Sequence, residues 1–225
     1  MKIETKEISL PLLYEKEVRL FIKRIDKIHP FVSGNKWFKL KYNLLEAKKQ
    51  GLNTLLTFGG AYSNHISATA FAAQEKGINS IGIIRGEEHL PLNPTLKFAK
   101  EQGMEIYYVS RSDYRLKHTD EFISKLKQKF GDFYLVPEGG TNDLAIIGTQ
   151  EILDKDDTHD YICCAVGTGG TIAGIINTST DKQTVIGFPA IKGFDLLQQD
   201  IENWTSTINY KFINTYVGSG YAKVS

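Results

Sequence analysis

Short apolar runs alternate along this chain with longer segments whose apolar residues recur at helical spacing. The runs predict strands over Val18–Lys23, Thr54–Phe58, Ser80–Ile84, Glu105–Val109, Phe133–Val136, Tyr161–Val166 and Val185–Phe188. Apolar residues three or four positions apart, each set followed by a glycine, predict helices over Lys36–Gln50, Ser63–Lys76 and Asn93–Gln102. This alternation favours an α/β fold built on open, mostly parallel sheets flanked by helices.

Composition sets the broad class of the protein. The chain has 225 residues, 41% hydrophobic and 24% charged, which is typical of a globular protein with one large or two small domains. Its net charge of +1 gives no indication of a nucleic-acid partner. No apolar run approaches the ~20 residues that span a bilayer, so no membrane partner is expected either.

The cysteines and histidines indicate neither a disulfide framework nor a metal site. Cys163 and Cys164 are adjacent in a predicted strand, where we expect them to be buried packing residues in a reducing, cytoplasmic protein. The five histidines are widely spaced and form none of the usual metal-binding motifs, so no metal is expected.

The turn Gly167–Thr171 predicts a phosphate site. It follows a predicted strand and opens a predicted helix, so backbone N–H groups and the helix dipole would face an anion. It lacks the lysine of a P-loop, and Ile172 stands where a dinucleotide fingerprint needs its third small residue. A single phosphate monoester remains, with a purely structural glycine turn as the alternative.

A second strand-to-helix turn, Gly59–His65, presents a hydroxyl, an amide and an imidazole at Ser63, Asn64 and His65. Ligands of open α/β sheets bind beyond the carboxyl ends of the strands, so this turn suits a carboxylate or a phenolic oxygen. The alternative is a serine that only caps the helix.

Lys36 begins a predicted helix, directly after Ser33-Gly34-Asn35. The helix dipole disfavours a protonated amine at this end, which makes the lysine more readily neutral and nucleophilic. The alternative is an ordinary solvated lysine. A nucleophilic lysine, a phosphate cradle and a polar turn together suit pyridoxal 5′-phosphate, which needs a lysine Schiff base and a phosphate cup.

Four segments carry a resemblance to a known family. They are Ser33-Gly34-Asn35-Lys36 with Lys39-Leu40, Ser63-Asn64-His65, Pro137-Glu138-Gly139-Gly140-Thr141-Asn142, and Gly167-Thr168-Gly169-Gly170-Thr171-Ile172-Ala173-Gly174. In order and spacing they resemble the 1-aminocyclopropane-1-carboxylate (ACC) deaminase/D-cysteine desulfhydrase family of tryptophan synthase β-like enzymes. The resemblance implies a two-domain pyridoxal-phosphate fold of type II. The large domain would comprise residues 1–39 and 146–225, and the small domain residues 40–145.

The resemblance also implies roles for individual residues. Lys36 would hold the cofactor covalently and shuttle protons, and Asn64 would bond the ring hydroxyl. Ser63, as a catalytic residue, would bind the substrate carboxylate together with Asn64 and His65. The cofactor phosphate would be held by Gly167, Thr168, Gly169, Gly170 and Thr171.

The implied activity is that of a lyase or deaminase that releases ammonia and a 2-oxo acid from a small amino acid. D-Cysteine would give pyruvate and sulfide, and ACC would give 2-oxobutyrate. Dehydration, racemisation or β-replacement on the same scaffold, or an inactive ligand-binding relative, are the alternatives. A cytoplasmic homodimer is the expected form.

The sequence departs from the family pattern at Ala61-Tyr62, at His65 and in its length. His65 replaces the glutamine of ACC deaminases and resembles the desulfhydrase branch. Family members also continue beyond the point matching Ser225, so the chain is expected to be truncated at its C-terminus, without the tyrosine near the substrate and the partner of the pyridine nitrogen.

Overall fold

Three sheets organise residues 2–190 and 193–216, the part of the chain that the computed structural model describes. The largest sheet is fully parallel and has the strand order β5-β4-β3-β6. Its strands are β3 (Thr54–Gly59), β4 (Asn79–Arg85), β5 (Glu105–Val109) and β6 (Tyr134–Val136). The buried patterns of β3 and β4 follow from this central position, since helices cover both faces.

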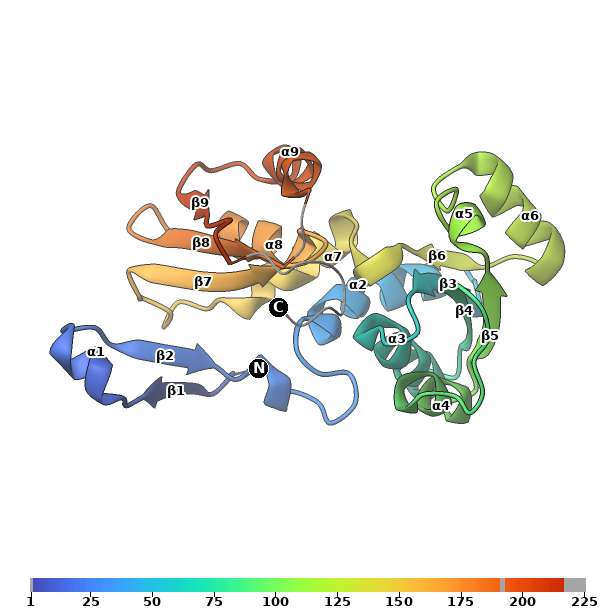
Figure 1. Ribbon diagram of the computed structural model, residues 1–225, viewed down its shortest axis with the longest axis horizontal. Helices are drawn as coiled ribbons and strands as arrows, with labels where there is room; N and C mark the ends of the chain where they lie inside the picture. The colour runs from blue at the N-terminus through green and yellow to red at the C-terminus, as the bar shows by residue number, and fades with distance from the viewer. Residues whose placement is uncertain (1, 191–192, 217–225) are drawn as a thin grey trace.

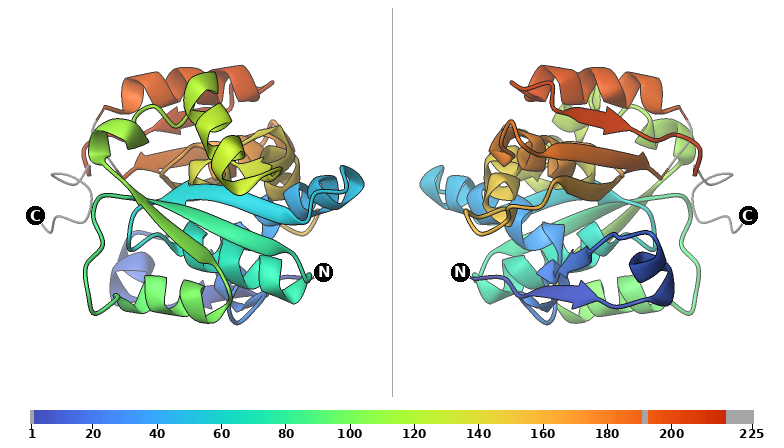
Figure 2. Two further views of the ribbon diagram at one scale, coloured as in Figure 1. Left: turned by 90° about the vertical axis from the view of Figure 1, so that its right-hand side faces the viewer. Right: turned by 90° about the vertical axis from the view of Figure 1, so that its left-hand side faces the viewer.

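Helices α3 (Asn64–Glu75) and α4 (Pro94–Glu101) lie on one face of this sheet, while α5 (Arg111–Tyr114) and α6 (Asp120–Phe130) lie on the other (Figures 1 and 2). Each face has its own apolar cluster. Ile66, Ile84 and Leu96 belong to the α3–α4 side, and Phe58 and Leu126 to the α6 side. The result is a three-layer α/β/α unit whose carboxyl-end loops are free to build a site.

A second parallel sheet has the order β7-β8-β9, with strands β7 (Tyr161–Val166), β8 (Thr184–Pro189) and β9 (Tyr210–Phe212). Helices α8 (Gly170–Thr178) and α9 (Phe194–Trp204) share one buried cluster with its strands. Between the two sheets run α2 (Asn35–Lys49), η2 (Glu138–Gly140), α7 (Asp143–Thr149) and η3 (Gln150–Ile152) (Figure 1).

Glycines let these central helices approach one another closely. A Cβ atom added to Gly148 of α7 would lie 2.1 Å from the carbonyl oxygen of Phe38 in α2. One added to Gly174 of α8 would lie 2.1 Å from Thr149 Oγ1. The α2–α7–α8 stack therefore depends on the missing side chains, and it joins the lysine-bearing helix to the glycine turn before α8.

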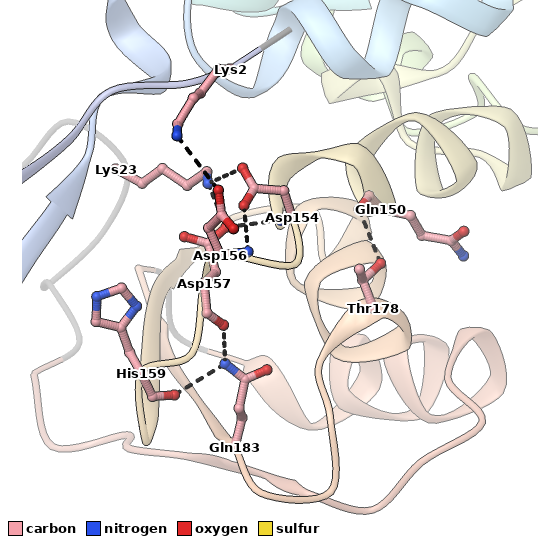
Figure 3. A network of polar contacts seen from close by, with 9 residues as sticks. All are labelled: Lys2, Lys23, Gln150, Asp154, Asp156, Asp157, His159, Thr178 and Gln183. Carbon is pink, nitrogen blue, oxygen red and sulfur yellow. Dashed lines mark hydrogen bonds and ion pairs between the residues drawn. The ribbon is translucent and has the colours of Figure 1, made fainter.

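The N-terminal segment forms an arm of antiparallel strands β1 (Thr5–Ile8) and β2 (Leu20–Lys23), with α1 (Pro11–Glu15) at its tip and η1 (Ile25–Lys27) at its base. Lys23 anchors the arm through Asp154, at 3.1 Å, and Asp157 (Figure 3). The Gln183 amide donates to the carbonyl oxygens of Asp157 and His159 and so fixes the loop that carries these carboxylates.

The predicted strands and helices are all present, with ends that differ by at most two residues. One expectation was wrong: Cys163 is exposed, because β7 lies at the edge of the sheet formed by the described residues and one of its faces is uncovered there. Among the described residues, no helix is long and apolar enough to cross a bilayer. Within the same ranges, no three His, Cys, Asp or Glu side chains gather closely enough to hold a metal ion.

Candidate active site

Lys36 is the second residue of α2, the helix that runs between the two parallel sheets (Figure 1). Gly34 opens the helix with a φ of 65°, a conformation that favours glycine. The Asn35 amide donates to Thr171 Oγ1 at 2.8 Å. The first turn of α2 is thereby tied to the start of α8, and the lysine predicted as nucleophile lies beside the turn predicted as phosphate cradle.

Two lysine amines converge on one carbonyl oxygen. Lys36 Nζ donates to the oxygen of Gly139 at 3.2 Å, and Lys39 Nζ donates to the same oxygen at 3.1 Å. Lys39 also donates to Thr141 Oγ1 at 2.8 Å and to Thr168 Oγ1 at 3.2 Å. Each of these acceptors is a neutral oxygen, so these contacts do not neutralise the charge of a protonated amine, and a bound anion would.

Burial depresses the pKa of both amines. It lowers the pKa of Lys36 from 10.5 to about 8. Lys39 is only 1% exposed, and its burial, followed by the nearby charge of Lys36, lowers the pKa of Lys39 well below its usual range. The sequence-based expectation of a readily neutral Lys36 therefore has the correct direction, and desolvation is the cause.

The turn Gly167–Thr171, predicted to bind a phosphate, combines a left-handed glycine with close packing before α8. Gly169 precedes α8 with a φ of 79°, and a Cβ atom there would lie 2.9 Å from Ile201 Cγ1. A Cβ atom on Gly170 would lie 2.8 Å from Thr141 Cγ2 and 3.4 Å from Lys39 Nζ, whereas one on Gly167 would meet open space. The backbone of this turn thus lies close to the buried Lys39 amine, and it precedes a helix N-terminus, where backbone N–H groups favour a phosphate.

Ser63, Asn64 and His65 form the N-terminus of α3, at the carboxyl end of β3. Ser63 is the N-cap residue, but its hydroxyl does not cap the helix, and Asn64 is exposed. Both residues immediately precede His65, whose ring lies against Gly140: a Cβ atom on that glycine would be 3.0 Å from His65 Cε1. The second predicted turn therefore packs against Gly140, next to Gly139, whose carbonyl oxygen accepts from both lysines.

The imidazole of His65 is buried, with 2% of the residue exposed. Thr57 Oγ1 donates to the carbonyl oxygen of Val136 at 2.8 Å, so it accepts from His65 Nε2, 2.7 Å away. Burial, together with the charges of Lys36 and Lys39, lowers the pKa of His65 well below its usual range. Because the imidazole of His65 is bonded to Thr57, the group of this residue that is left for a ligand is its backbone N–H.

The sequence analysis assigned no role to Lys39, although Lys39-Leu40 is part of a segment that resembles the family. The available signal was its spacing: residues three apart share one face of a helix, so Lys36 and Lys39 had to point the same way. Thr141 was quoted with Pro137–Asn142 and likewise had no role assigned, because only the folded chain brings it to Lys39.

The sequence profile of the family described as "Pyridoxal-phosphate dependent enzyme" matches residues 3–209. The chain belongs to this family. A cofactor phosphate and a carbonyl carbon that reacts with amines account for the site's combination of a glycine turn, the partly buried Lys36 and the buried Lys39.

Two curated relatives have names that include 1-aminocyclopropane-1-carboxylate deaminase. A protein of Thermotoga maritima provisionally named 1-aminocyclopropane-1-carboxylate deaminase is 38% identical over 164 residues, 69% of this chain and 52% of that protein. The Arabidopsis thaliana bifunctional D-cysteine desulfhydrase/1-aminocyclopropane-1-carboxylate deaminase, mitochondrial, is 34% identical over 69% of this chain and 44% of its own length. This chain thus spans about half the length of the curated relatives it matches.

A crystal structure described as that of an ACC deaminase homologue superposes on the whole chain with a TM-score of 0.83 and 23% identity, and the match covers 74% of that structure. An aspartate racemase matches with a TM-score of 0.66 and 16% identity over 89% of this chain and 61% of its own. At these identities the superpositions speak for the fold alone, and they confirm the expected α/β fold of type II.

Proposed function

We propose that this protein is a pyridoxal-phosphate-dependent lyase or deaminase that releases ammonia and a 2-oxo acid from a small amino acid, as D-cysteine desulfhydrases and ACC deaminases do. The observation that carries the proposal is the convergence of Lys36 and Lys39 on the Gly139 carbonyl, beside the glycine turn of α8. The names of the relatives in Thermotoga maritima and Arabidopsis thaliana support the same reaction class.

The residues present fit the cofactor. Lys36 would carry it covalently, because its amine has a pKa of about 8 and is partly neutral near physiological pH. The phosphate would lie against the backbone of Gly167, Thr168, Gly169, Gly170 and Thr171. The Lys39 amine adjoins this turn through Thr168 and would supply the counter-charge. When bound, pyridoxal phosphate withdraws electrons from the bonds at the substrate Cα.

The chain's own groups would do the remaining work. The N-terminus of α3 would bind the substrate carboxylate through the Ser63 hydroxyl and the N–H groups of Asn64 and His65, because unpaired N–H groups there attract anions. The Asn64 amide would bond the ring hydroxyl. Lys36, once released by the substrate amine, would take the α-proton of D-cysteine at its Nζ; ACC has no α-proton and requires another route to ring opening.

Several parts of the proposal concern the whole protein rather than a single residue. The small domain of residues 40–145 and the large domain of residues 1–39 and 146–225 would enclose the site between the two parallel sheets. The protein would act in the cytoplasm as a homodimer. Since this chain spans about half the length of its curated relatives, the substrate and the level of activity belong to the proposal as well.

Product analysis after cofactor loading tests the proposal. We expect sulfide and pyruvate from D-cysteine, or 2-oxobutyrate from ACC, together with ammonia. Borohydride reduction should fix the cofactor on the Lys36 peptide, and Lys36→Ala should abolish both the fixation and turnover. Fixation on another lysine, or none at all with a folded chain, would refute the assignment of Lys36.

The same panel separates the alternative reactions. Turnover of serine or threonine alone would indicate a dehydratase, and inversion at Cα without ammonia would indicate a racemase. Cofactor fixation with no product from any amino acid would favour a ligand-binding relative. The fold cannot decide between them, because an aspartate racemase and an O-ureido-L-serine synthase have it too.

A further inference from the structure

The turn Pro137–Gly140 lies between the two sheets and carries the carbonyl oxygen that both site lysines contact. Gly139 and Gly140 have φ values of 67° and 70°, and Gly140 N donates to the carbonyl oxygen of Pro137 at 2.8 Å. Because the Gly139 carbonyl and the Gly140 N–H belong to one planar peptide, this bond fixes the carbonyl relative to the turn. The direction of the carbonyl relative to the two lysines therefore depends on how the turn as a whole is held.

Two of these contacts come from the sides of the turn. A Cβ atom on Gly139 would lie 2.8 Å from Thr168 Cγ2, and one on Gly140 would lie 3.0 Å from His65 Cε1. The turn is thus packed between the start of α8 and the start of α3. Packing of this kind limits how far the turn can move, but it does not select which way a peptide oxygen points.

Glu138 is the one residue of Pro137–Gly140 whose side chain can form a hydrogen bond or an ion pair. Its Oε1 accepts from the hydroxyl of Tyr114 at 2.8 Å, and its Oε2 lies 3.4 Å from Lys117 Nζ. Tyr114 is 3% exposed and the Lys117 side chain 15%, so both partners are held in place by the small domain. Hydrogen bonds and ion pairs to a carboxylate are stronger than hydrogen bonds between neutral groups.

The Tyr114 ring is itself held by contacts with three neighbouring side chains. Phe58 of β3 packs edge-on against it at 6.0 Å, and Lys117 Nζ lies 5.0 Å from its centroid. Arg85, the last residue of β4, lies over the same ring at 5.7 Å. The hydroxyl that binds Glu138 therefore has a fixed position relative to the central sheet.

We propose that Glu138, held by Tyr114 and Lys117, is a positioning residue for Lys36: it orients the Gly139 carbonyl toward the two lysine amines. The anchor is on the small domain, and the lysines begin the helix that joins the sheets. Through the Gly139 carbonyl, Glu138 thereby sets the position of the Lys36 amine relative to the Ser63-Asn64-His65 turn. The role rests on the proposed function of Lys36, but the amine's geometry can be measured without any turnover.

Competitive labelling of amines in the full chain, stripped of cofactor, measures the titration of Lys36, which depends on whether the Gly139 carbonyl accepts from its amine. In the wild type, labelling of Lys36 should rise with pH around 8. Among the described residues, the titratable groups that face Lys36 are Lys39 and His65, and both are kept in every variant. Loss of the carbonyl acceptor disfavours the ammonium form, so Glu138→Ala should lower the midpoint by about one pH unit.

Graded variants separate positioning from simple destabilisation. Glu138→Gln can still accept from Tyr114 and should retain most of the wild-type midpoint, while Tyr114→Phe should shift it in the same direction as Glu138→Ala but less. Lys117 and His118, the other titratable groups near Glu138, are unchanged. Tyr114→Phe removes one oxygen atom, and it keeps the test informative if Glu138→Ala fails to fold.

The chain offers a matched control. Glu151 also accepts from a tyrosine, Tyr42 at 2.5 Å, and pairs with a lysine, Lys41 at 2.7 Å, but the side chains of Glu151 and Lys41 are 39% and 41% exposed. Glu151→Ala and Tyr42→Phe should leave the labelling midpoint of Lys36 unchanged. An unchanged or raised midpoint in Glu138→Ala, or an equal shift in Glu151→Ala, would overturn the positioning role. If the labelling midpoint shifts as expected in Glu138→Ala and Tyr114→Phe, but no cofactor becomes fixed on Lys36 of the wild type, the result would instead count against the proposed function.

Discussion

Lys36 and Lys39 donate to the same oxygen atom, the carbonyl of Gly139, at 3.2 and 3.1 Å. Two ammonium groups at one neutral acceptor repel each other, and burial makes the charged forms costlier still. The site is therefore least stable when both amines are protonated and no anion is bound. An anionic cofactor that takes one amine covalently and pairs with the other would remove both costs.

The lowered pKa of Lys36 predicts a specific dependence of stability on pH. Its folded-state pKa of about 8 lies below its ordinary value of 10.5, so between these values the unfolded chain binds more protons and the folded state gains stability as pH rises. Below pH 8 the cost of burying the charge is present in full. We expect Lys36→Met to be more stable than wild type at neutral pH by up to about 3 kcal/mol.

Urea unfolding of the cofactor-free proteins across this range measures that difference. The advantage of Lys36→Met should shrink as pH rises above 8 and vanish near 10.5. Comparison at each pH cancels the titration of groups remote from Lys36, while the pKa values of Lys39 and His65 should rise in the variant because the Lys36 charge that lowers them is gone. An advantage that is constant with pH would mean that Lys36 is not a buried charge in the folded protein.

Lys39 is predicted to recognise the cofactor phosphate rather than the ring. A charge-assisted hydrogen bond to a phosphate contributes about 1.5–3 kcal/mol, so Lys39→Met should weaken pyridoxal phosphate binding about tenfold to a hundredfold. Pyridoxal, which lacks the phosphate, should bind the variant and the wild type alike. Equilibrium dialysis with both ligands makes the comparison. Equal losses for the two ligands would assign Lys39 a structural role instead.

Much of the fold followed from local pattern. Glu105–Val109 and Tyr161–Val166 were predicted with the bounds that the structure has, because apolar runs between turn residues leave few alternatives. The exposure of Cys163 could not be predicted in this way. Whether a strand is central or at an edge depends on the strand order, and β7 has a neighbour on one side in the described sheet.

The site was predictable where chemistry is local in sequence. Lys36 at a helix start and the Gly167–Thr171 turn each indicate their role through neighbouring residues. The partnership of Glu138 with Tyr114 depends on a contact between residues 24 apart, and that of Lys39 with Thr168 on residues 129 apart. No spacing rule connects such pairs, because the intervening strands and helices decide which side chains meet.

Two glycines of the phosphate turn should respond differently to alanine. Gly169 has a φ of 79° and a would-be Cβ 2.9 Å from Ile201, so Gly169→Ala should cost about 1–3 kcal/mol of unfolding free energy. A Cβ atom on Gly167 meets open space, so Gly167→Ala should change stability by at most about 0.5 kcal/mol while weakening cofactor binding. Thermal unfolding and cofactor titration give the two quantities. Unaltered cofactor affinity in Gly167→Ala would place the phosphate elsewhere.

The N-terminal arm is predicted to depend on a single buried ion pair. The side chains of Lys23 and Asp157 are 14% and 8% exposed, and the Asp157 carboxylate also accepts from the backbone N–H of Asp154 (Figure 3). Asp157→Ala would leave Lys23 partly buried with Asp154 alone, so we expect a loss of about 1–3 kcal/mol. The loss should be local, because the sheets have cores of their own.

Limited trypsin digestion tests this separation, with cleavage after Arg19 as the readout for release of the arm. Asp157→Ala should speed that cleavage severalfold while cofactor fixation on Lys36 persists. Glu7→Gln is the control: it breaks the pair of Glu7 with Arg19, whose side chains are 48% and 73% exposed, and such exposed pairs contribute at most about 1 kcal/mol. Equal acceleration in both variants would show that strand pairing within the arm, rather than its anchor at Asp157, limits its release.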